Sequence, residues 1–291
     1  MKFKYQVQDH SIKLKSYAKL NLSLLVFKAN KQNYHPICSV FQEISLSDHI
    51  SITVITKKEC ILKCNHPEFP LDQRNLLQQV YSKMKHKIKY GLIIKIKKNI
   101  PIGGGLGGGS SNAACLIMFI NSFFQLNYSD QKLYGIGKSI GADIPFFLKG
   151  GTQLVRGIGQ KTSTLKTKKN QYYVLIIPPI NISTKTIFNL YDKEKNLLLP
   201  TKTPKKILKS YLGKNSLKKT VFNFNTTFKE LTTQLESYNT PPVYLSGTGS
   251  TLFFVVKRWK EAISWEKNLS KIFNDCIIKA VKPIKKIPIN L

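Results

Sequence analysis

The chain has 291 residues, of which 42% are hydrophobic and 11% aromatic, so we predict a packed core and exclude global disorder. It contains no run of 18 apolar residues and no signal-peptide pattern, so we expect neither a membrane span nor a secretion signal. The net charge of +31 rests on 46 basic residues, only three of which are arginine. Proteins that read nucleic acids favour arginine, so we interpret the dispersed lysines as solvated surface and predict no nucleic-acid or membrane partner.

The cysteines are odd in number and form no pattern typical of a zinc site. They are Cys38, Cys60, Cys64, Cys115 and Cys276. We therefore predict free thiols in a reducing, cytoplasmic location. These features are compatible with a monomer or a homodimer.

The N-terminal part predicts three strands and a helix. Between Ile12 and Phe27 the residues alternate, which places Leu20 and Leu22 on one face of a strand and Lys19 and Asn21 on the other. A polar turn around Asn30–Asn33 follows. We then predict a strand at Ser39–Ser45, a turn at Ser47–Asp48, a strand over residues 50–54 and a helix at Asn75–His86.

Alternation returns over residues 92–100 and predicts a strand that ends before Pro101. A glycine-rich segment comes next and leads into a pattern with helical spacing. We expect this helix to begin at Ser110, because Ser110, Ser111 and Asn112 are favourable N-cap residues.

The rest of the chain predicts helices and strands in mixed order, which favours an α+β second domain. The expected helices are Asp130–Ile140 (ended by Gly141), Lys185–Tyr191, Thr226–Leu235 and Trp259–Ile272. The expected strands follow Gly151, span Tyr172–Ile177 and Leu252–Val256, and end the chain. The lysine-rich stretch Lys161–Lys169 is interpreted as an exposed linker, which divides the chain into residues 1–160 and 161–291.

The segment Pro101–Ser111 (PIGGGLGGGSS) contains six glycines between two periodic elements. Glycine adopts positive φ and admits a ligand close to the backbone, and a helix N-terminus attracts anions, so this segment predicts a phosphate-binding loop. A Walker loop is excluded because no lysine follows the glycines. Gly103, Gly105 and Gly108 formally satisfy the dinucleotide pattern GxGxxG. That fold needs an acidic residue about twenty positions later, and none occurs before Asp130.

Five segments, in the correct order, resemble motifs of the GHMP kinases. PIGGGLGGGSS is similar to the second motif, in the expanded form typical of the 4-diphosphocytidyl-2-C-methyl-D-erythritol kinases. The others are SYAKLNLSL at Ser16–Leu24, NYHPICSVFQ at Asn33–Gln42, GADIPFFLKG at Gly141–Gly150 and YLSGTGSTLF at Tyr244–Phe253. Tyr17, Asn33 and Pro36 depart from the proline, glycine and glutamate that are usual in the family. Asparagine tolerates the left-handed turn that glycine would supply.

The resemblance implies an α+β, two-domain GHMP kinase fold. Its N-terminal domain would be ribosomal-protein-S5-like α/β and bind ATP, and its C-terminal domain would be ferredoxin-like α+β. It also implies the ATP-dependent phosphorylation of the 2-hydroxyl of 4-(cytidine 5′-diphospho)-2-C-methyl-D-erythritol, in the non-mevalonate route to isoprenoid precursors. Magnesium is implied by the use of ATP, with no ligand assigned beyond a contribution from Ser110 or Ser111.

Two catalytic residues follow from the resemblance. Asp143, which we place on a tight, extended corner after a helix, is expected to accept the proton of the attacking hydroxyl. A turn aspartate bonded to its own backbone is the structural alternative. Lys19 is expected to keep Asp143 ionised and to stabilise the acceptor oxygen, and Asn21 to hydrogen-bond the acceptor's hydroxyls.

The resemblance also assigns binding residues. Tyr34 is expected to stack on the cytosine, His35 to hydrogen-bond its edge, and Phe188 to supply the opposing stacking face. A second backbone cradle is expected at Ser246–Ser250, with Gly247, Thr248 and Gly249 in contact with the substrate. The residues expected to bind ATP are Pro101, Ile102, Gly103, Gly104, Gly105, Leu106, Gly107, Gly108, Gly109, Ser110 and Ser111.

Two alternative functions remain at this point. The first is another GHMP kinase, acting on homoserine or mevalonate, which the Tyr34-His35 pair and the expanded glycine loop disfavour. The second is a basic RNA-binding α/β module that uses the lysines, which predicts steeply salt-dependent RNA binding.

Overall fold

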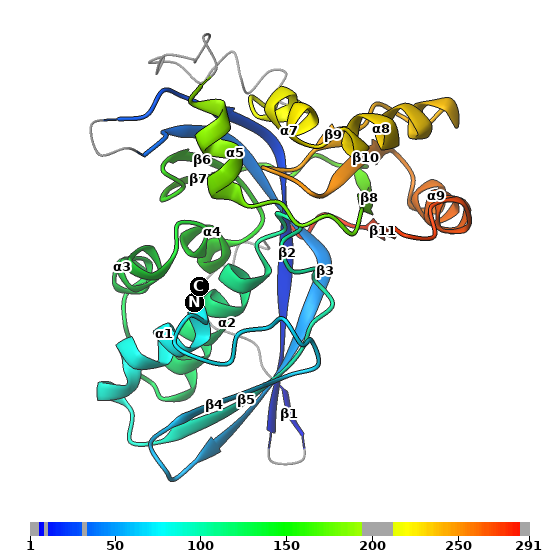
Figure 1. The fold of residues 1–291 in the computed structure, drawn as a ribbon. Coiled ribbons are helices and arrows are strands. Elements are labelled where there is room, and N and C mark those ends of the chain that lie inside the picture. Colours follow the sequence, from blue (N-terminus) through cyan, green and yellow to red (C-terminus); the bar gives the residue numbers. More distant parts are fainter. Residues whose placement is uncertain (1–5, 9–10, 31–33, 194–211, 286–291) are drawn as a thin grey trace.

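The computed structural model describes residues 6–8, 11–30, 34–193 and 212–285, which form two sheets flanked by helices (Figure 1). Within these ranges the first sheet has seven strands; five follow the order β1-β2-β3-β5-β4, β6 also pairs with β3, and β7 pairs with β6. They are β1 (Gln6–Gln8), β2 (Ser11–Val26), β3 (Ile37–Ile55), β4 (Cys60–Cys64), β5 (Gly91–Lys97), β6 (Thr152–Gly157) and β7 (Lys161–Leu165). The helices on one side of this sheet are α1 (Leu76–Met84, extended by the 3-10 helix Lys85–Lys87), α2 (Gly108–Phe123), α3 (Asp130–Ile140) and α4 (Ile144–Lys149).

The second sheet has four antiparallel strands in the order β11-β8-β10-β9. They are β8 (Tyr172–Ile177), β9 (Tyr244–Leu245), β10 (Leu252–Val256) and β11 (Ile277–Val281). The helices of this half are α5 (Thr184–Tyr191), α7 (Lys218–Phe224), α8 (Thr227–Ser237) and α9 (Trp259–Ile272). The bounds predicted for β8, β10 and α9 are confirmed, as is the mixed order of helices and strands.

β2 alternates between two buried faces. Leu20 and Leu22 belong to the apolar cluster between the two sheets, together with Leu175 of β8 and Phe253 of β10. Lys19 lies on the opposite face, yet it is only 5% exposed. The predicted alternation therefore separates an apolar core face from a buried polar face, and the polar face is available to form a site.

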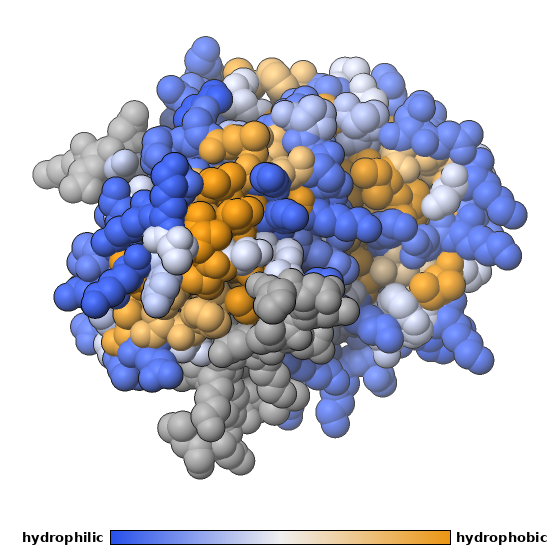
Figure 2. Space-filling model, turned by 90° about the horizontal axis from the view of Figure 1, so that it is seen from below, coloured by the Kyte–Doolittle hydropathy of each residue, from blue (hydrophilic) through white to orange (hydrophobic). Residues whose placement is uncertain are grey.

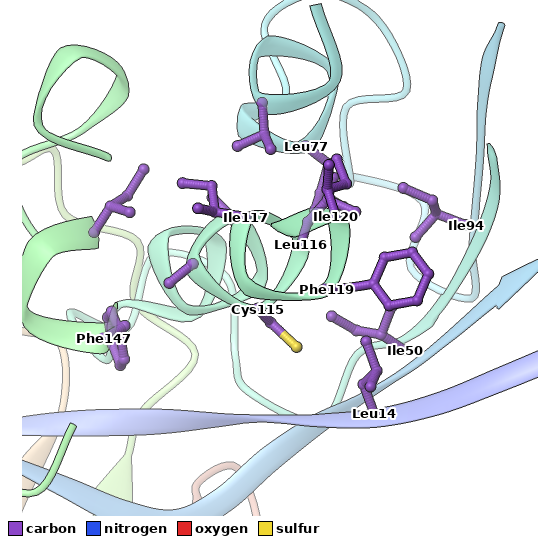
Figure 3. Packing of buried hydrophobic residues seen from close by; sticks show 14 of the residues in the cluster. Leu14, Ile50, Leu77, Ile94, Cys115, Leu116, Ile117, Phe119, Ile120 and Phe147 are labelled. Carbon is purple, nitrogen blue, oxygen red and sulfur yellow. The ribbon is translucent and has the colours of Figure 1, made fainter. Parts of the chain in front are cut away.

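α2 is the central helix of the first core. It is apolar around most of its circumference, as expected for a helix that is covered on several sides. Figure 3 shows Leu116 directed towards Leu77 of α1, and Phe119 directed towards Ile50 of β3 and Leu14 of β2. This packing fixes the N-terminal end of α2, where the glycine-rich segment arrives.

β3 runs without interruption from Ile37 to Ile55, so the turn predicted at Ser47–Asp48 is wrong. The pairing of β3 with β2 shifts there, because Tyr17 faces Ser47 whereas Ala18 faces Ile44. The extra residues form a bulge, which bends the strand instead of ending it. As a result, the first half of β3 pairs with β6 and the second half pairs with β5.

Two further predictions are wrong at the ends of elements. The stretch Lys161–Lys169, predicted as a linker, begins with β7, which pairs with β6 in a hairpin at an edge of the first sheet. α2 begins at Gly108 instead of Ser110, because Gly107 adopts the left-handed conformation that starts the helix earlier.

The division of the chain after residue 160 stays a prediction. Residues 31–33 of the predicted polar turn lie outside the described residues, and β1, β4, β9, α4 and α7 were not predicted.

Many of the lysines in the described ranges lie on solvated faces, as along β5, where Lys95 and Lys97 are exposed and alternate with buried Ile94 and Ile96. Figure 2 shows hydrophilic side chains around and between the apolar areas of one face, and not gathered in one stripe. All five cysteines are free. Across the described ranges, every helix is too short or too polar to cross a membrane.

A buried ion pair ties β3 to the end of β5. Asp48 is fully buried, and its Oδ2 atom lies 2.5 Å from Nζ of Lys98. Its Oδ1 atom accepts hydrogen bonds of 2.9 Å from the backbone N–H groups of Asn99 and Ile100. Because these groups bond to Asp48 and not to a neighbouring strand, β5 ends at Lys97 and not at the predicted Ile100. The pair thereby fixes the chain directly before the glycine-rich segment.

We expect Asp48→Asn to lower the free energy of unfolding by about 3–5 kcal/mol, because it leaves the Lys98 ammonium buried without a counter-charge. Urea-induced unfolding measures the loss. The double variant Asp48→Asn with Lys98→Met should lose less than the single variant, since it leaves no unpaired charge inside. The exposed Asp275→Asn, as control, should change the free energy of unfolding by less than about 0.5 kcal/mol. Equal losses in the single and double variants would contradict this account.

Candidate active site

The glycine loop, residues 101–111, consists of left-handed glycines followed by a helix N-terminus. Gly103, Gly105 and Gly107 have φ of +78°, +71° and +71°, a region that other residues rarely adopt. Gly107 is the N-cap of α2. The first N–H groups of an α-helix have no partner within the helix, and the positive end of its dipole adds to their attraction for anions. The loop therefore has the geometry of a backbone cradle for phosphate.

A second glycine-rich loop, Ser246–Ser250, lies directly against the first. A Cβ atom at Gly105 would stand 2.5 Å from the carbonyl oxygen of Gly249, so a side chain at this position has no space. Oγ1 of Thr251 donates a hydrogen bond of 2.6 Å to the carbonyl oxygen of Gly104. The two loops, which are far apart in the sequence, thus form one backbone structure.

Two cavities meet at the glycine loop. The larger has a volume of about 850 Å³ and the smaller one of about 330 Å³, and Gly105 and Gly107 line both. The larger cavity brings together most of the predicted catalytic and substrate residues, which are Lys19, Asn21, Tyr34, His35, Asp143, Phe188, Gly247 and Thr248. The smaller cavity is lined by every residue of the predicted ATP-binding set from Pro101 to Ser110.

Two predicted site residues lie elsewhere. Ser111 is buried in the first turns of α2. Gly249 faces Ile182 and Leu245, whose side-chain carbons would contact a Cβ atom at its position. Both residues therefore support the loops from within.

The floor of the larger cavity is a buried lysine with three polar or aromatic neighbours. Nζ of Lys19 lies 3.6 Å from Oδ2 of Asp143, donates a hydrogen bond of 2.5 Å to Oδ1 of Asn21, and lies 4.6 Å from the centre of the Phe41 ring. The backbone N–H of Lys19 donates to the carbonyl oxygen of Leu106 at 3.0 Å. The lysine that points into the cavity is therefore also bonded to the glycine loop through its main chain.

Burial controls the titration of this lysine. Removing the ammonium from water lowers the pKa of Lys19 below its ordinary value of 10.5, and the nearby Asp143 carboxylate acts in the opposite direction. The charge of Lys19 therefore depends on the carboxylate beside it.

Asp143 is positioned by the short helix α4. Its φ and ψ are −86° and −14°, so the extended corner predicted for it is wrong. The chain turns directly into α4 because Pro145 is well suited to a first helical turn. The Asp143 side chain makes no capping hydrogen bond and faces Lys19 instead. At the other end of α4, Nε2 of Gln153 donates hydrogen bonds of 2.9 Å to the carbonyl oxygens of Phe146 and Gly150.

The far end of the larger cavity is aromatic. Tyr34 is 57% exposed at its edge. The ring of His35 is held by Nδ1, 2.9 Å from the carbonyl oxygen of Phe27, and by Nε2, 3.1 Å from the carboxylate of Asp192. The Phe188 ring lies against His35, with 5.1 Å between ring centres. The predicted roles of Tyr34, His35 and Phe188 stay predictions, and both ring nitrogens of His35 already have partners here.

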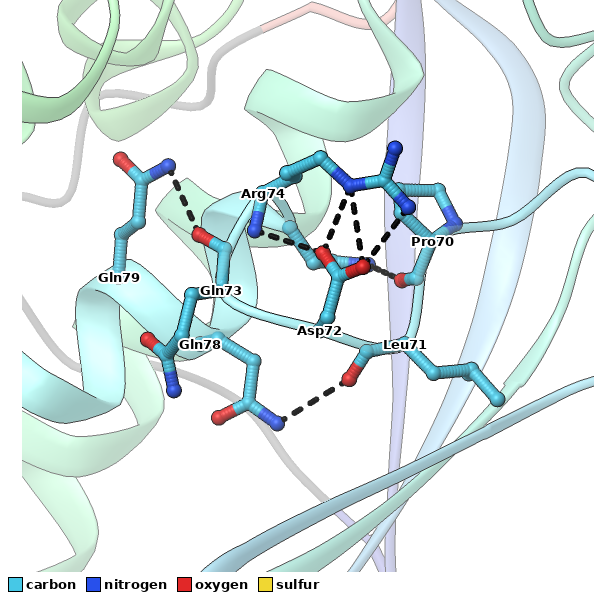
Figure 4. Close-up of polar contacts among 8 residues, drawn as sticks. Pro70, Leu71, Asp72, Gln73, Arg74, Gln78 and Gln79 are labelled. Atoms are coloured by element: carbon cyan, nitrogen blue, oxygen red, sulfur yellow. Dashed lines mark hydrogen bonds and ion pairs between the residues drawn. The ribbon is translucent and has the colours of Figure 1, made fainter.

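The edge of the smaller cavity is shaped by the segment before α1. The guanidinium of Arg74 donates three hydrogen bonds of 2.7–3.0 Å to the carboxylate of Asp72 (Figure 4). These bonds lower the pKa of Asp72. Asn75 caps α1 by accepting a bond from the N–H of Leu77, and its Nδ2 donates to the carbonyl oxygen of Pro70. A short ordered segment therefore borders the cavity beside the glycine loop.

Several residues of the site were not predicted. Lys98 lines the smaller cavity, and Phe41 and Asp192 line the larger one. Lys98 could not be distinguished from the many other lysines in the sequence, and Asp192 lies outside every motif. Phe41 could have been identified, because it lies in the segment NYHPICSVFQ, which resembles a family motif.

Comparison with known proteins gives the family. The domain described as the GHMP kinases N terminal domain matches residues 75–151. The 4-diphosphocytidyl-2-C-methyl-D-erythritol kinase of Clostridium beijerinckii is 34% identical over 281 residues, which cover 92% of this chain and 99% of the relative. The enzyme of the same name from Clostridium tetani is 35% identical, with coverage of 83% of this chain and 90% of the relative.

Solved structures agree on the fold. The crystal structure of a 4-(cytidine 5′-diphospho)-2C-methyl-D-erythritol kinase has a TM-score of 0.74 at 23% identity, covering 94% of this chain and 100% of that chain. A homoserine kinase from Cytophaga hutchinsonii has a TM-score of 0.71 at 17% identity, covering 97% and 98%. The GHMP kinase fold expected from the motifs is therefore confirmed, and the identity and coverage of the curated relatives show that this chain belongs to the 4-diphosphocytidyl-2-C-methyl-D-erythritol kinase family.

Proposed function

We propose that this chain transfers the γ-phosphoryl group of ATP to the 2-hydroxyl of 4-(cytidine 5′-diphospho)-2-C-methyl-D-erythritol, the acceptor named in its relatives. As a member of this family the chain is an ATP-dependent kinase. The observation that carries the proposal is the Lys19–Asp143 pair, at 3.6 Å, in a cavity that shares Gly105 and Gly107 with the phosphate cradle. A hydroxyl in the larger cavity would thus lie next to a phosphate in the smaller one.

The chemistry follows from this arrangement. The acceptor oxygen attacks the γ-phosphorus, the bond from that phosphorus to the bridging oxygen breaks, and ADP leaves with the electron pair. Asp143 accepts the hydroxyl proton, and the Lys19 ammonium stabilises the negative charge that develops on the acceptor oxygen. Asn21 is bonded to Lys19 and fixes the direction of the ammonium.

The glycine loop holds the donor mainly through backbone N–H groups, because the Lys98 ammonium is already paired with Asp48. We infer that Mg²⁺ accompanies ATP, neutralises phosphate charge, and is held mostly by phosphate oxygens and water. Among the described residues no group of three histidine, cysteine or acidic side chains is close enough to hold a metal by itself. The hydroxyl of Ser110, which lines the smaller cavity, is a suitable additional ligand.

The cellular setting stays part of the proposal. We infer a cytoplasmic location, which the five free cysteines support. We also predict that the chain has no nucleic-acid partner and that it is a monomer or a homodimer.

The acceptor is tested by a coupled assay that follows ADP release with three compounds, the cytidine-diphospho acceptor, homoserine and mevalonate. We expect turnover with the first and background rates with the other two. Activity on homoserine or mevalonate, without activity on the cytidine compound, would overturn the proposal.

Asp143→Ala should lower kcat by about 10²–10⁴-fold, the usual contribution of a positioned general base. Affinity for a non-hydrolysable ATP analogue should stay close to that of the wild type, because Asp143 lies outside the smaller cavity. Steady-state kinetics and calorimetry measure the two quantities. Wild-type turnover in this variant would remove Asp143 from the mechanism.

The pH dependence of kcat/KM should show the ionisation of the Lys19 ammonium. Burial lowers the pKa of Lys19 below 10.5, so its ammonium loses the proton at a lower pH than an ordinary lysine does. The value of kcat/KM should therefore fall as the pH rises through this lowered pKa, which gives an alkaline limb. Lys19→Arg keeps its charge at all accessible pH values. It should therefore be slower but lack this limb. An unchanged limb in Lys19→Arg would assign the titration to another group.

Gly107→Ala should raise the KM for ATP and lower kcat. Gly107 has φ of +71°, and a Cβ atom there would lie 2.9 Å from the Phe147 ring and 3.2 Å from Cγ of Lys19. The matched control is Gly135→Ala in α3, where nothing lies within 4 Å of the new Cβ atom. The control should leave KM unchanged and raise stability by up to about 1 kcal/mol. Equal kinetic effects in both variants would contradict a special role of Gly107.

A further inference from the structure

The polar face of the first sheet continues from β2 across β3 to β6. In this antiparallel ladder Asn21 pairs with Phe41, and Phe41 pairs with Gln153. Directly paired residues project their side chains from the same face of a sheet, so Gln153 lies on the face that carries Lys19 and Asn21. Gln153 is fully buried, lines neither of the two cavities at the glycine loop, and has no part in the proposed chemistry. A buried amide on this face therefore needs an explanation.

Gln153 binds the end of α4. Its Nε2 atom donates hydrogen bonds of 2.9 Å to the carbonyl oxygens of Phe146 and Gly150. The last carbonyl groups of a helix have no partner within the helix, and a helix of six residues is too short to be stable by itself. Contacts with the rest of the protein must therefore fix the position of α4. The Gln153 amide supplies such a contact, because it joins two carbonyl groups at the end of α4 to the strand β6.

The position of α4 determines the geometry of the catalytic pair. Asp143 is the N-cap of α4, and its side chain makes no capping hydrogen bond. The distance of 3.6 Å between the Asp143 carboxylate and the Lys19 ammonium therefore depends on where α4 lies. The Phe146 ring of α4 also packs edge-on against Phe41, with 5.3 Å between ring centres, and Phe41 in turn contacts the ammonium. A shift of α4 would thus change both the carboxylate and the aromatic contact of Lys19.

The other end of the Gln153 amide argues against a role in stability alone. Its Oε1 atom is buried and has no hydrogen-bond partner among the residues that the structure describes. Such an atom loses the hydrogen bonds that water gives it in the unfolded chain, and this loss offsets much of the gain from the two bonds of Nε2. An apolar side chain of similar length would avoid the loss but could not bind α4. The net benefit of a glutamine at this position is therefore the fixed position of α4.

We propose that Gln153 is a positioning residue for phosphoryl transfer, because it holds the end of α4 on the sheet and thereby keeps the Asp143 carboxylate beside the Lys19 ammonium. The proposal rests on the proposed function for the roles of Lys19 and Asp143. The effect of Gln153 on the distance between them, however, can be measured in the free protein.

The test is Gln153→Met, which keeps the length of the side chain and removes both hydrogen bonds to α4. The kcat for the cytidine-diphospho acceptor should fall by about tenfold or more, since a small misplacement of a reacting group has a large effect on rate. Asp143 is the charged group that raises the pKa of Lys19, so a more distant carboxylate should lower that pKa further. NMR titration of the lysine side chains measures this pKa without substrate, with the Lys19 signal identified by its loss in Lys19→Arg.

The matched control is Gln78→Met in α1. Gln78 is also buried, and its Nε2 atom donates to two backbone carbonyl oxygens, those of Cys60 at 2.9 Å and Leu71 at 3.4 Å. Gln78→Met should leave the Lys19 pKa and the kcat at saturating ATP unchanged. If Gln153→Met does not fold, Gln153→Leu removes the same two bonds and replaces it in both measurements.

Three results would decide against one or both proposals. Equal losses of kcat in the Gln153 and Gln78 variants, with an unchanged Lys19 pKa, would show a general loosening of the fold and overturn the positioning role. Wild-type kcat and pKa in Gln153→Met would also overturn it, while the proposed function stands. If the wild type does not turn over the cytidine compound, the proposed function is rejected, and the Lys19 pKa in Gln153→Met still decides whether Gln153 holds Asp143 in place.

Discussion

The site is arranged around a lysine ammonium that is held away from water. Such a charge costs on the order of several kcal/mol unless an opposite charge and hydrogen-bond partners are held beside it. For Lys19 the opposite charge is the Asp143 carboxylate and the hydrogen-bond acceptor is Asn21, while the ring of Phe41 lies beneath the ammonium. Asp143 can take its place because α4 begins there, and Phe147 of that helix fills the space next to Gly107. The buried charge, the short helix and the glycine loop therefore pack against one another, and each helps to fix the position of the others.

The elements that could be predicted from the sequence are those with a clear apolar pattern. β8 and β10 have the expected bounds because each is a short, continuous run of aromatic and aliphatic residues, and α9 because its apolar residues follow the helical period. The bend in β3 could not be predicted, since a bulge has no period and Ser47-Asp48 has the composition of a turn. Only the folded chain shows that the Asp48 carboxylate bonds to the backbone after β5. α4 has six residues, too few for a helical period to be visible.

The residues of the candidate site also fall into two groups, those that could be predicted from the sequence and those that could not. Motifs predicted Lys19, Asp143 and the glycine loop, which lie far apart in the sequence and meet in the folded chain. Lys98 could not be predicted, because its importance comes from its pairing with a buried acid and not from its neighbours in sequence. Asp192 is separated from His35 by 157 positions and belongs to no motif. The His35–Asp192 contact depends on how the second half of the chain packs on the first, and the Lys98–Asp48 contact depends on how β3 lies beside the end of β5.

The wall between the two cavities is made of backbone. Gly105 and Gly107 line both cavities, and Gly105 is in close contact with the second loop. A molecule on either side therefore acts on the same few peptide units. Any change that one substrate causes in the affinity for the other must be returned by an equal factor, because binding free energies are reciprocal. This wall thus couples the binding of one substrate to the binding of the other. The order in which the substrates bind does not change the size of that coupling.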